Sequence, residues 1–295
     1  MSKINLKKPK PNEIPKFIIK TGQFFEFLST KLATRYAAKL FTTPIKHKVP
    51  NRELEMDKNS IQNELIIPSI NKKVIIYEYG KSANKILLVH GWSGRGTQLY
   101  KIADELLKND YSTISFDAPA HGKSPGKNTI MVEYIESVLE IDKKFGPFYA
   151  AIGHSLGGIT LLNAVNYGMK TNKLVTIGTA NIVLDIFIDF VNKIKMNSKQ
   201  VDLLRLYFEK KYNKTMDSLS SYINVSKIKM PILVIHDEND DEIPVADAHE
   251  ISKHFNPDGF GGKLIITKGL GHRKILGDSV VINEIIKFIK PLENA

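Results

Sequence analysis

The sequence predicts an α/β protein with a mostly parallel central sheet of about eight strands, flanked by helices. Two observations support this prediction. Short β-rich runs, most of them continuously apolar, alternate along the chain with segments of helical periodicity. Continuous apolar runs are typical of strands covered on both faces, and strand–helix alternation is typical of parallel strands joined by right-handed crossovers. Such sheets bind ligands at the carboxyl ends of their strands, so functional residues are expected there.

Most elements of this framework can be placed directly from the pattern. Strands are expected at 73–79, 85–90, 112–117, 148–153, 173–178, 231–237 and 263–268. Helices are expected at 97–109, 128–144, 156–168, 244–255 and 278–290. The predicted core therefore has two parts, residues 61–180 and residues 231–295.

The interval 181–230 breaks the alternation, because it separates two strands by about 50 residues where a crossover needs a dozen or so. Two helices are expected in it, over NIVLDIFIDFVNKIK and SKQVDLLRLYFEKKY. A long insertion of this kind is a candidate cap or lid over a site. The alternative is a pair of helices that pack on the body without controlling access.

Residues 1–60 form a basic N-terminal extension. They carry 13 Lys and Arg against 5 Asp and Glu, which is +8 of the net charge of +11. Apolar residues recur at helical spacing between Pro15 and Phe41, with lysines and an arginine elsewhere on the helix surface. A basic amphipathic helix can lie on an anionic membrane, or it can dock on its own protein. Docking is the favoured interpretation.

Composition excludes several classes of protein. The chain has no cysteine, which rules out disulfides, cysteine-ligated zinc and thiol catalysis. Its uneven charge is not that of a nucleic-acid-binding protein, so no nucleic-acid partner is expected. No stretch approaches the roughly 20 apolar residues of a membrane span, and the N-terminus lacks the apolar core of a signal peptide. We therefore expect a soluble, cytoplasmic protein.

The most informative motif is GHSLG at 153–157, which places Ser155 between an expected strand and an expected helix. A sharp strand-to-helix turn strains the backbone of the serine and projects its hydroxyl beyond the sheet edge. Side chains at the flanking positions would clash, which explains Gly153 and Gly157. The backbone N–H of Leu156 opens the helix, where the positive end of the helix dipole favours an anion.

A serine hydroxyl becomes an effective nucleophile only beside a base, and the base needs an orienting acid. His272 lies in a glycine-rich loop after the last expected strand. Asp237, Asp240 and Asp241 follow the preceding strand. The order serine, acid, histidine is that of one fold with a nucleophile elbow.

An oxyanion needs a second hydrogen-bond donor, from a loop after an earlier strand. The segment LLVHGWSGRG supplies this loop. His90 and Gly91 end the strand, and the next backbone N–H belongs to Trp92. Four components of one mechanism thus follow the ends of predicted strands in the expected order.

These motifs together resemble the α/β-hydrolase superfamily, from about residue 73 to the C-terminus. Its H-G-x loop appears as HGW, its D-x-P-G-H-G-x-S segment as DAPAHGKS, its nucleophile elbow as GHSLGG and its histidine loop as GLGHRK. Its acid motif appears as HDENDDEIP. Ala120 and Asp237 stand where the family usually has glycine. The insertion at 181–230 lies where the family usually carries a cap.

The resemblance implies a role for each matching residue. Ser155 would be the nucleophile, His272 the base and Asp240 the acid that orients it, with the N–H groups of Trp92 and Leu156 as the oxyanion hole. Residues expected near the substrate are His90, Gly91, Trp92 and His154. No metal or organic cofactor is implied.

The function expected is therefore a serine hydrolase that cleaves a small or medium carboxylic ester or thioester, with a preference for hydrophobic groups. Two alternatives remain open. One is a binding protein that keeps the fold without turnover. The other is a peripheral lipid-ester hydrolase that contacts the membrane through its basic N-terminal helix.

Overall fold

The computed structural model describes residues 14–291, and it divides the chain into two compact units. The sheet unit comprises residues 42–183 together with the chain from residue 215 onward. The helical unit comprises residues 1–41 and 184–214. Residues 215–230, which the sequence grouped with the insertion, thus fold with the sheet unit, and so do residues 42–60 of the N-terminal extension.

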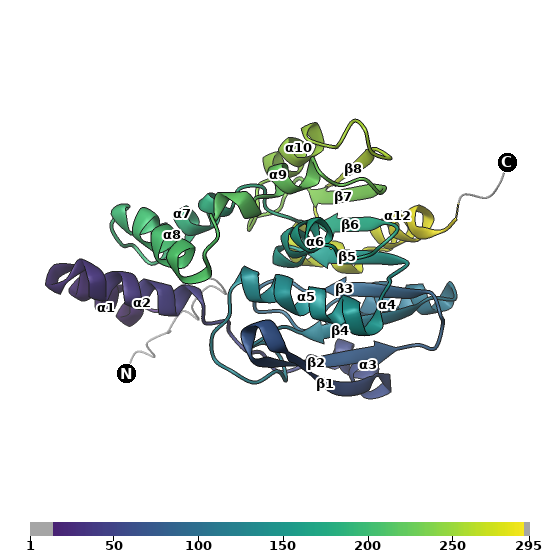
Figure 1. Cartoon of the computed structure of the whole chain (residues 1–295), viewed down its shortest axis with the longest axis horizontal. Coiled ribbons are helices and arrows are strands. Elements are labelled where there is room, and N and C mark those ends of the chain that lie inside the picture. The colour runs from purple at the N-terminus through teal and green to yellow at the C-terminus, as the bar shows by residue number, and fades with distance from the viewer. Residues whose placement is uncertain (1–13, 292–295) are drawn as a thin grey trace, which may run out of the picture. The chain divides into compact units, whose positions relative to one another are not determined.

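The sheet unit is built on eight strands in the order β1-β2-β4-β3-β5-β6-β7-β8. Figure 1 shows this sheet between two layers of helices. The strands are β1 Ile61–Ile67, β2 Lys72–Tyr79, β3 Lys85–Val89, β4 Ser112–Asp117, β5 Ala150–His154, β6 Leu174–Ile177, β7 Ile232–Asp237 and β8 Gly262–Thr267. The run from β4 to β8 is parallel, whereas β1, β2 and β4 pair antiparallel. The predicted fold class is confirmed.

Strand β1 is a strand of this sheet that the sequence pattern did not reveal. It is an edge strand, and most of its side chains are exposed. A strand with solvent on one edge and on much of its surface carries neither a continuous apolar run nor a regular alternation. Its position is set by pairing with β2, from Ile61 opposite Glu78 to Ile67 opposite Lys72.

The helices of the sheet unit form one layer on each face of the sheet. One layer contains α5 Met131–Phe145, α6 Leu156–Asn166, α9 Ser221–Val225 and α10 Val245–Lys253. The other contains α3 Leu54–Asn59, α4 Tyr100–Lys108 and α12 Ser279–Ile289 (Figure 1). A short helix, α11 Gly271–Lys274, follows β8. Covering both faces explains why β4, β5, β6 and β7 are buried along their whole lengths.

The helical unit joins the N-terminal helices to the insertion. It contains α1 Lys16–Leu28, α2 Thr30–Phe41, α7 Val183–Lys193 and α8 Lys199–Tyr212. Phe41 contacts the rings of Phe187, Phe190 and Phe208, with centroid separations of 4.8, 5.1 and 5.6 Å. The Thr34 hydroxyl also donates a hydrogen bond to the Gln200 side chain. The N-terminal segment therefore packs on the insertion through aromatic side chains and a buried polar contact.

A buried ion pair fixes the loop after β3 to the segment that precedes β1. The Arg95 guanidinium donates to both carboxylate oxygens of Glu53, at 3.1 and 2.9 Å, and the Thr97 hydroxyl donates to one of them at 2.7 Å. The Glu53 carboxylate is buried and Arg95 is largely so. Because a buried charge is costly without its partner, this contact is expected to control the stability of the loop.

Replacing Glu53 with Ala should lower the free energy of unfolding by about 3 kcal/mol or more, because Arg95 would be left buried without a partner. Urea denaturation measures this as a lower midpoint with an unchanged slope. Glu55→Ala is the matched control, since Glu55 is exposed two residues away, and its effect should stay within about 0.5 kcal/mol. Equal effects of the two substitutions would contradict this role for the ion pair.

Candidate active site

Ser155 lies at a strained turn between β5 and α6. Its backbone angles are φ 54° and ψ −120°, a combination that a residue with a side chain rarely adopts. Two hydrogen bonds hold the turn: Ser155 N–H donates to Ile177 O at 2.8 Å, and Gly158 N–H donates to Ser155 O at 2.9 Å. The serine is therefore presented at the carboxyl end of the sheet, as the motif predicted.

The glycines around Ser155 are required by close backbone packing. A Cβ at Gly153 would lie 2.5 Å from the backbone of Gly157, and a Cβ at Gly157 would lie 2.2 Å from Val89 O. Contacts this short do not occur, and backbone atoms cannot move aside as a flexible side chain can. The first turn of α6 therefore packs directly against the end of β3, which brings the loop after β3 to the serine.

His272 lies on α11, and its ring is fixed from two sides. His272 Nδ1 is 2.7 Å from Asp240 Oδ2. The ring packs against that of His154 at a centroid distance of 4.6 Å, and His154 Nε2 hydrogen-bonds to the backbone oxygen of His272 at 2.9 Å. With Nδ1–H donated to the carboxylate, the lone pair of Nε2 is available to accept a proton.

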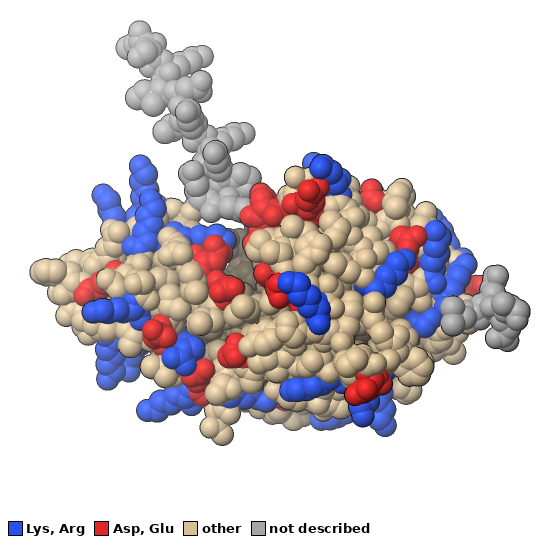
Figure 2. Space-filling view, turned by 90° about the horizontal axis from the view of Figure 1, so that it is seen from above, with Lys and Arg blue, Asp and Glu red and all other residues tan. Residues whose placement is uncertain are grey.

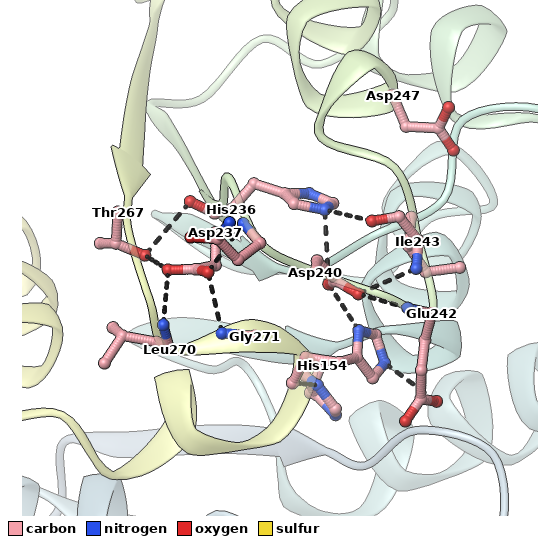
Figure 3. A network of polar contacts seen from close by, with 12 residues as sticks. His154, His236, Asp237, Asp240, Glu242, Ile243, Asp247, Thr267, Leu270 and Gly271 are labelled. Carbon is pink, nitrogen blue, oxygen red and sulfur yellow. Dashed lines mark hydrogen bonds and ion pairs between the residues drawn. The ribbon is translucent and has the colours of Figure 1, made fainter. Parts of the chain in front are cut away.

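Asp240 has the contacts of an orienting acid. Its Oδ1 accepts hydrogen bonds from the N–H groups of Glu242 and Ile243, both at 2.9 Å, and its Oδ2 faces His272. Burial opposes ionisation of this carboxyl, but the hydrogen bond from His272 and the two backbone N–H groups outweigh it and lower its pKa. Asp240 is therefore held as an anion beside the imidazole (Figure 3).

Asp237 occupies a different position from Asp240. Its carboxylate accepts hydrogen bonds from the backbone N–H groups of Asn239, Leu270 and Gly271 and from the Thr267 hydroxyl, at 2.7 to 3.1 Å. Figure 3 shows the Asp237 carboxylate joining the end of β7 to Thr267, Leu270 and Gly271. Asp237 thus positions the two loops that carry Asp240 and His272.

Ser155 and His272 both lie at the end of β6. Ser155 N–H bonds to Ile177 O, and the next residue, Gly178, lies directly under the His272 ring. A Cβ at Gly178 would be 3.2 Å from His272 Nδ1 and 3.5 Å from Asp240 Oδ2. In the described chain no hydrogen bond joins the Ser155 hydroxyl to His272. Such catalytic hydrogen bonds are often long before substrate binds.

The loop after β3 brings two backbone donors to the serine. A Cβ at Gly91 would lie 3.0 Å from Ser155 Cβ, so this loop touches the turn. Among residues 14–291, the N–H groups of Trp92 and Leu156 donate no hydrogen bond to another protein group. Both remain available to an anion formed at the serine. Trp92 is 38% exposed, so its indole can also contact a substrate.

His90 and His154 are buried rather than presented to a substrate. His90 Nδ1 donates to Gly91 O at 2.7 Å, and its Nε2 accepts from Ala118 N–H at 3.1 Å. Burial lowers the pKa of both rings, that of His154 to about 3, which keeps them neutral. This geometry favours a supporting role for both histidines over contact with substrate.

Asp117 and Gly178 are positioning residues that the sequence analysis did not single out. The buried Asp117 carboxylate accepts from the N–H groups of Gly96 and Lys123 and from the Tyr77 hydroxyl. It therefore ties the turn after β4 to the loop after β3. Asp117 could have been identified from the sequence, because it is the first residue of the motif DAPAHGKS. Gly178 has φ +58° and follows β6 without a motif of its own.

Neither a metal site nor a membrane span is found in the part of the chain that the structure describes. It contains no group of three or more His, Cys, Asp or Glu side chains arranged to hold a metal ion. No helix within residues 14–291 is both long enough and apolar enough to cross a bilayer.

Comparison with known proteins identifies the fold. Residues 84–193 match the family described as alpha/beta hydrolase fold. An esterase from Pyrococcus furiosus superposes with a TM-score of 0.64 at 18% identity, covering 84% of this chain and 97% of that one. An esterase from Exiguobacterium antarcticum gives 0.58 at 16%, covering 75% and 97%. A membrane phospholipase A described as a bacterial virulence factor gives 0.62 at 15%, covering 95% and 100%. No curated protein matches in sequence.

These findings confirm the fold that the sequence motifs predicted. The chain has the α/β-hydrolase fold. At identities of 15 to 18% the likeness to solved structures establishes the fold alone. The reaction and the substrate depend on the chemistry of the site.

Replacing Gly178 with Ala should reduce kcat/KM for a carboxylic ester by at least about tenfold, because the new Cβ would displace His272 and Asp240. Gly261→Ala is the matched control: Gly261 also has a positive φ, but open space surrounds its Cβ position. Both variants should lose stability, and only Gly178→Ala should lose activity. Equal loss of activity in both would count against the packing argument.

Replacing Asp237 with Asn should lower the free energy of unfolding by about 2 kcal/mol at neutral pH, since an amide cannot accept all four hydrogen bonds. The bonds from Gly271, Thr267, Leu270 and Asn239 outweigh the opposing effect of burial and lower the pKa of Asp237.

A lowered pKa stabilises the fold above the ordinary aspartate value, and this contribution is lost as the pH falls through the folded-state pKa. The difference between wild type and Asp237→Asn should therefore be full above about pH 5 and shrink below about pH 4. Urea titrations across this range measure it, with the exposed Asp241→Asn as control. A difference that is constant with pH would refute the assignment.

Proposed function

We propose that this protein is a serine hydrolase that cleaves a carboxylic ester or thioester through an acyl-enzyme intermediate. The observation that carries the proposal is the pairing of His272 Nδ1 with Asp240 Oδ2 at 2.7 Å, beside a serine held at a strained strand-to-helix turn. A serine, an imidazole and a buried carboxylate in this order are the components of one nucleophilic mechanism.

In the first step the Ser155 Oγ attacks the carbonyl carbon, and His272 Nε2 accepts the hydroxyl proton. The imidazolium that forms is stabilised by the Asp240 carboxylate, whose lowered pKa keeps it ionised at neutral pH. His272 then gives the proton to the leaving oxygen or sulfur. Water attacks the acyl-enzyme with His272 again as base, and this restores Ser155.

The tetrahedral intermediate of each step carries a negative oxygen. The N–H groups of Trp92 and Leu156 would donate to it, since neither is used elsewhere in the described chain. Leu156 N–H also lies at the first turn of α6, where the helix dipole favours negative charge. Removing one such donor typically costs about 10²-fold or more in kcat.

The site favours an ester with an apolar group near the serine. Trp92 is the exposed apolar side chain of the loop that touches Ser155. Its indole would pack against an acyl or alcohol group of small or medium size. The similar structures include esterases, and we infer the same general substrate class for this chain. The absence of cysteine is in keeping with the reducing cytoplasm.

A binding protein without turnover is the second candidate. Such a protein has no need for a buried imidazole–carboxylate pair, a strained serine and two unused backbone donors. The strained serine and the unused backbone donors cost stability, so their presence beside the imidazole–carboxylate pair favours catalysis.

Fluorophosphonate labelling tests the proposal, because the probe phosphonylates an activated serine. Wild type should be labelled at Ser155, as mapped by mass spectrometry, and Ser155→Ala should not be labelled. Ester hydrolysis should fall by about 10³-fold or more in that variant. Ser226→Ala, at an exposed serine far along the chain, should behave as wild type.

Folded wild type that is neither labelled nor active on a panel of esters and thioesters would favour the binding protein. Near-normal hydrolysis by Ser155→Ala would exclude Ser155 as nucleophile. Circular dichroism of each variant separates loss of the nucleophile from loss of the fold.

A further inference from the structure

Most of the net charge of the described residues lies in the helical unit. Residues 14–41 and 184–214 carry 12 Lys and Arg against 5 Asp and Glu, whereas residues 42–183 and 215–291 carry 26 against 24. The described part of the helical unit thus carries +7, and the unit with the candidate active site carries only +2. In Figure 2 blue Lys and Arg side chains project from several sides of the helical unit.

Helix α1 presents an aromatic face to solvent. Phe17, Phe24 and Phe27 are 70, 57 and 88% exposed, and positions 17, 24 and 27 fall on one side of a helix. Lys16 and Lys20 are exposed on the same side. Single apolar residues scattered over a surface are common, but three phenylalanines on one exposed helix face form an apolar patch. Such a patch indicates a binding surface.

The opposite side of α1 is already used for packing within the unit. Phe25 packs edge-on against Tyr36 of α2 at a centroid distance of 5.3 Å, and the Tyr36 hydroxyl donates to Ile18 O. A Cβ at Gly22 would meet Met196 at 3.2 Å. Helix α1 therefore packs on its own unit through this side, and the exposed phenylalanines on its other side can contact a binding partner.

A basic groove of about 650 Å³ runs between α2 and α8 of the same unit. Its lining residues are Thr30, Lys31, Thr34, Arg35, Leu203, Tyr207, Lys210 and Lys211. The lining contains four cations and no carboxylate. Within the described chain none of these cations lies within 4.0 Å of a carboxylate oxygen. Three side-chain hydroxyls, those of Thr30, Thr34 and Tyr207, and the aliphatic stems of the lysines complete a lining suited to a phosphate-bearing group.

We propose that the helical unit binds the surface of an anionic phospholipid bilayer, with the α1 phenylalanines in the interfacial layer and the cations of the unit attracted to lipid phosphates. A bilayer surface offers a negative surface potential and an apolar layer together, which matches both features of the unit. A second copy of this unit would be repelled by its charge of the same sign. A nucleic acid would leave the aliphatic and phenyl surface of α1 without an apolar partner.

The proposal extends beyond ester hydrolysis and does not depend on it. It assigns the surface that would bring the enzyme to lipid-dissolved esters, whereas the chemistry stays in the sheet unit. Binding should therefore be the same for Ser155→Ala as for wild type.

Co-sedimentation of the full chain with vesicles tests the proposal. Wild type should sediment with vesicles of phosphatidylcholine containing about 30% phosphatidylglycerol and remain in solution with pure phosphatidylcholine. Raising NaCl to about 0.5 M should weaken binding, because salt screens the charges. Phe27→Ser should weaken binding at least about fivefold, and Phe17→Ser/Phe24→Ser/Phe27→Ser further.

Two matched controls distinguish binding through this surface from non-specific binding to vesicles. Phe260→Ser removes a phenylalanine that is 82% exposed in the sheet unit, and it should bind as wild type. Charge reversal in the groove, Lys31→Glu/Arg35→Glu/Lys210→Glu/Lys211→Glu, should weaken binding at least about tenfold. The same reversal at exposed lysines of the sheet unit, Lys81→Glu/Lys127→Glu/Lys227→Glu/Lys229→Glu, should have a clearly smaller effect.

Three results would overturn the proposal. The first is wild type that does not sediment with the anionic vesicles. The second is equal loss of binding in the groove variant and in its control, which would reduce the effect to net charge. The third is an oligomer in sedimentation velocity that Phe27→Ser dissociates while vesicle binding is unchanged, which would make the α1 face a self-association surface.

Discussion

The arrangement of the site depends on one constraint, the close backbone packing between the first turn of α6 and the end of β3. Because Gly157 lies against Val89 O, the strained Ser155 is held beside the loop of Gly91 and Trp92. A residue with φ 54° persists only where its surroundings over-determine it. At Ser155 this conformation is held by hydrogen bonds to β6 and α6 and by the close packing of the neighbouring glycines. The turn supplies both the serine hydroxyl and the backbone N–H of Leu156.

Buried carboxylates organise the loops around this turn, each in its own way. Glu53 holds the loop after β3 through Arg95, Asp117 joins that loop to the turn after β4, and Asp237 joins the loops after β7 and β8. In each case a carboxylate accepts hydrogen bonds from a segment that is distant in the sequence. Asp240 differs, because one of its oxygens faces the His272 imidazole. Of these four acids, only Asp240 contacts the His272 imidazole, whose Nε2 also lies 3.9 Å from Glu242 Oε2.

The two units divide the properties of the protein between them. The sheet unit is nearly neutral and contains every component of the candidate catalytic machinery, whereas the helical unit carries the charge and the exposed phenylalanines. This unit is formed by segments from the N-terminus and from the middle of the chain, joined by the aromatic contacts of Phe41. Binding to a surface and chemistry on a substrate can therefore be altered separately by substitution.

The sequence by itself determined the fold class, the serine turn and the order of serine, acid and histidine, because these features depend on local chemistry. Apolar runs mark buried strands, and glycines mark places where a side chain cannot fit. The tertiary structure decided what depends on contacts between distant segments. Three aspartates lie within residues 237–241 at the end of β7, and only their hydrogen bonds to the loop after β8 separate Asp240 from Asp237. Likewise, β1 is a strand because it pairs with β2. A glycine is required at position 178 because His272, nearly a hundred residues later in the chain, packs against it.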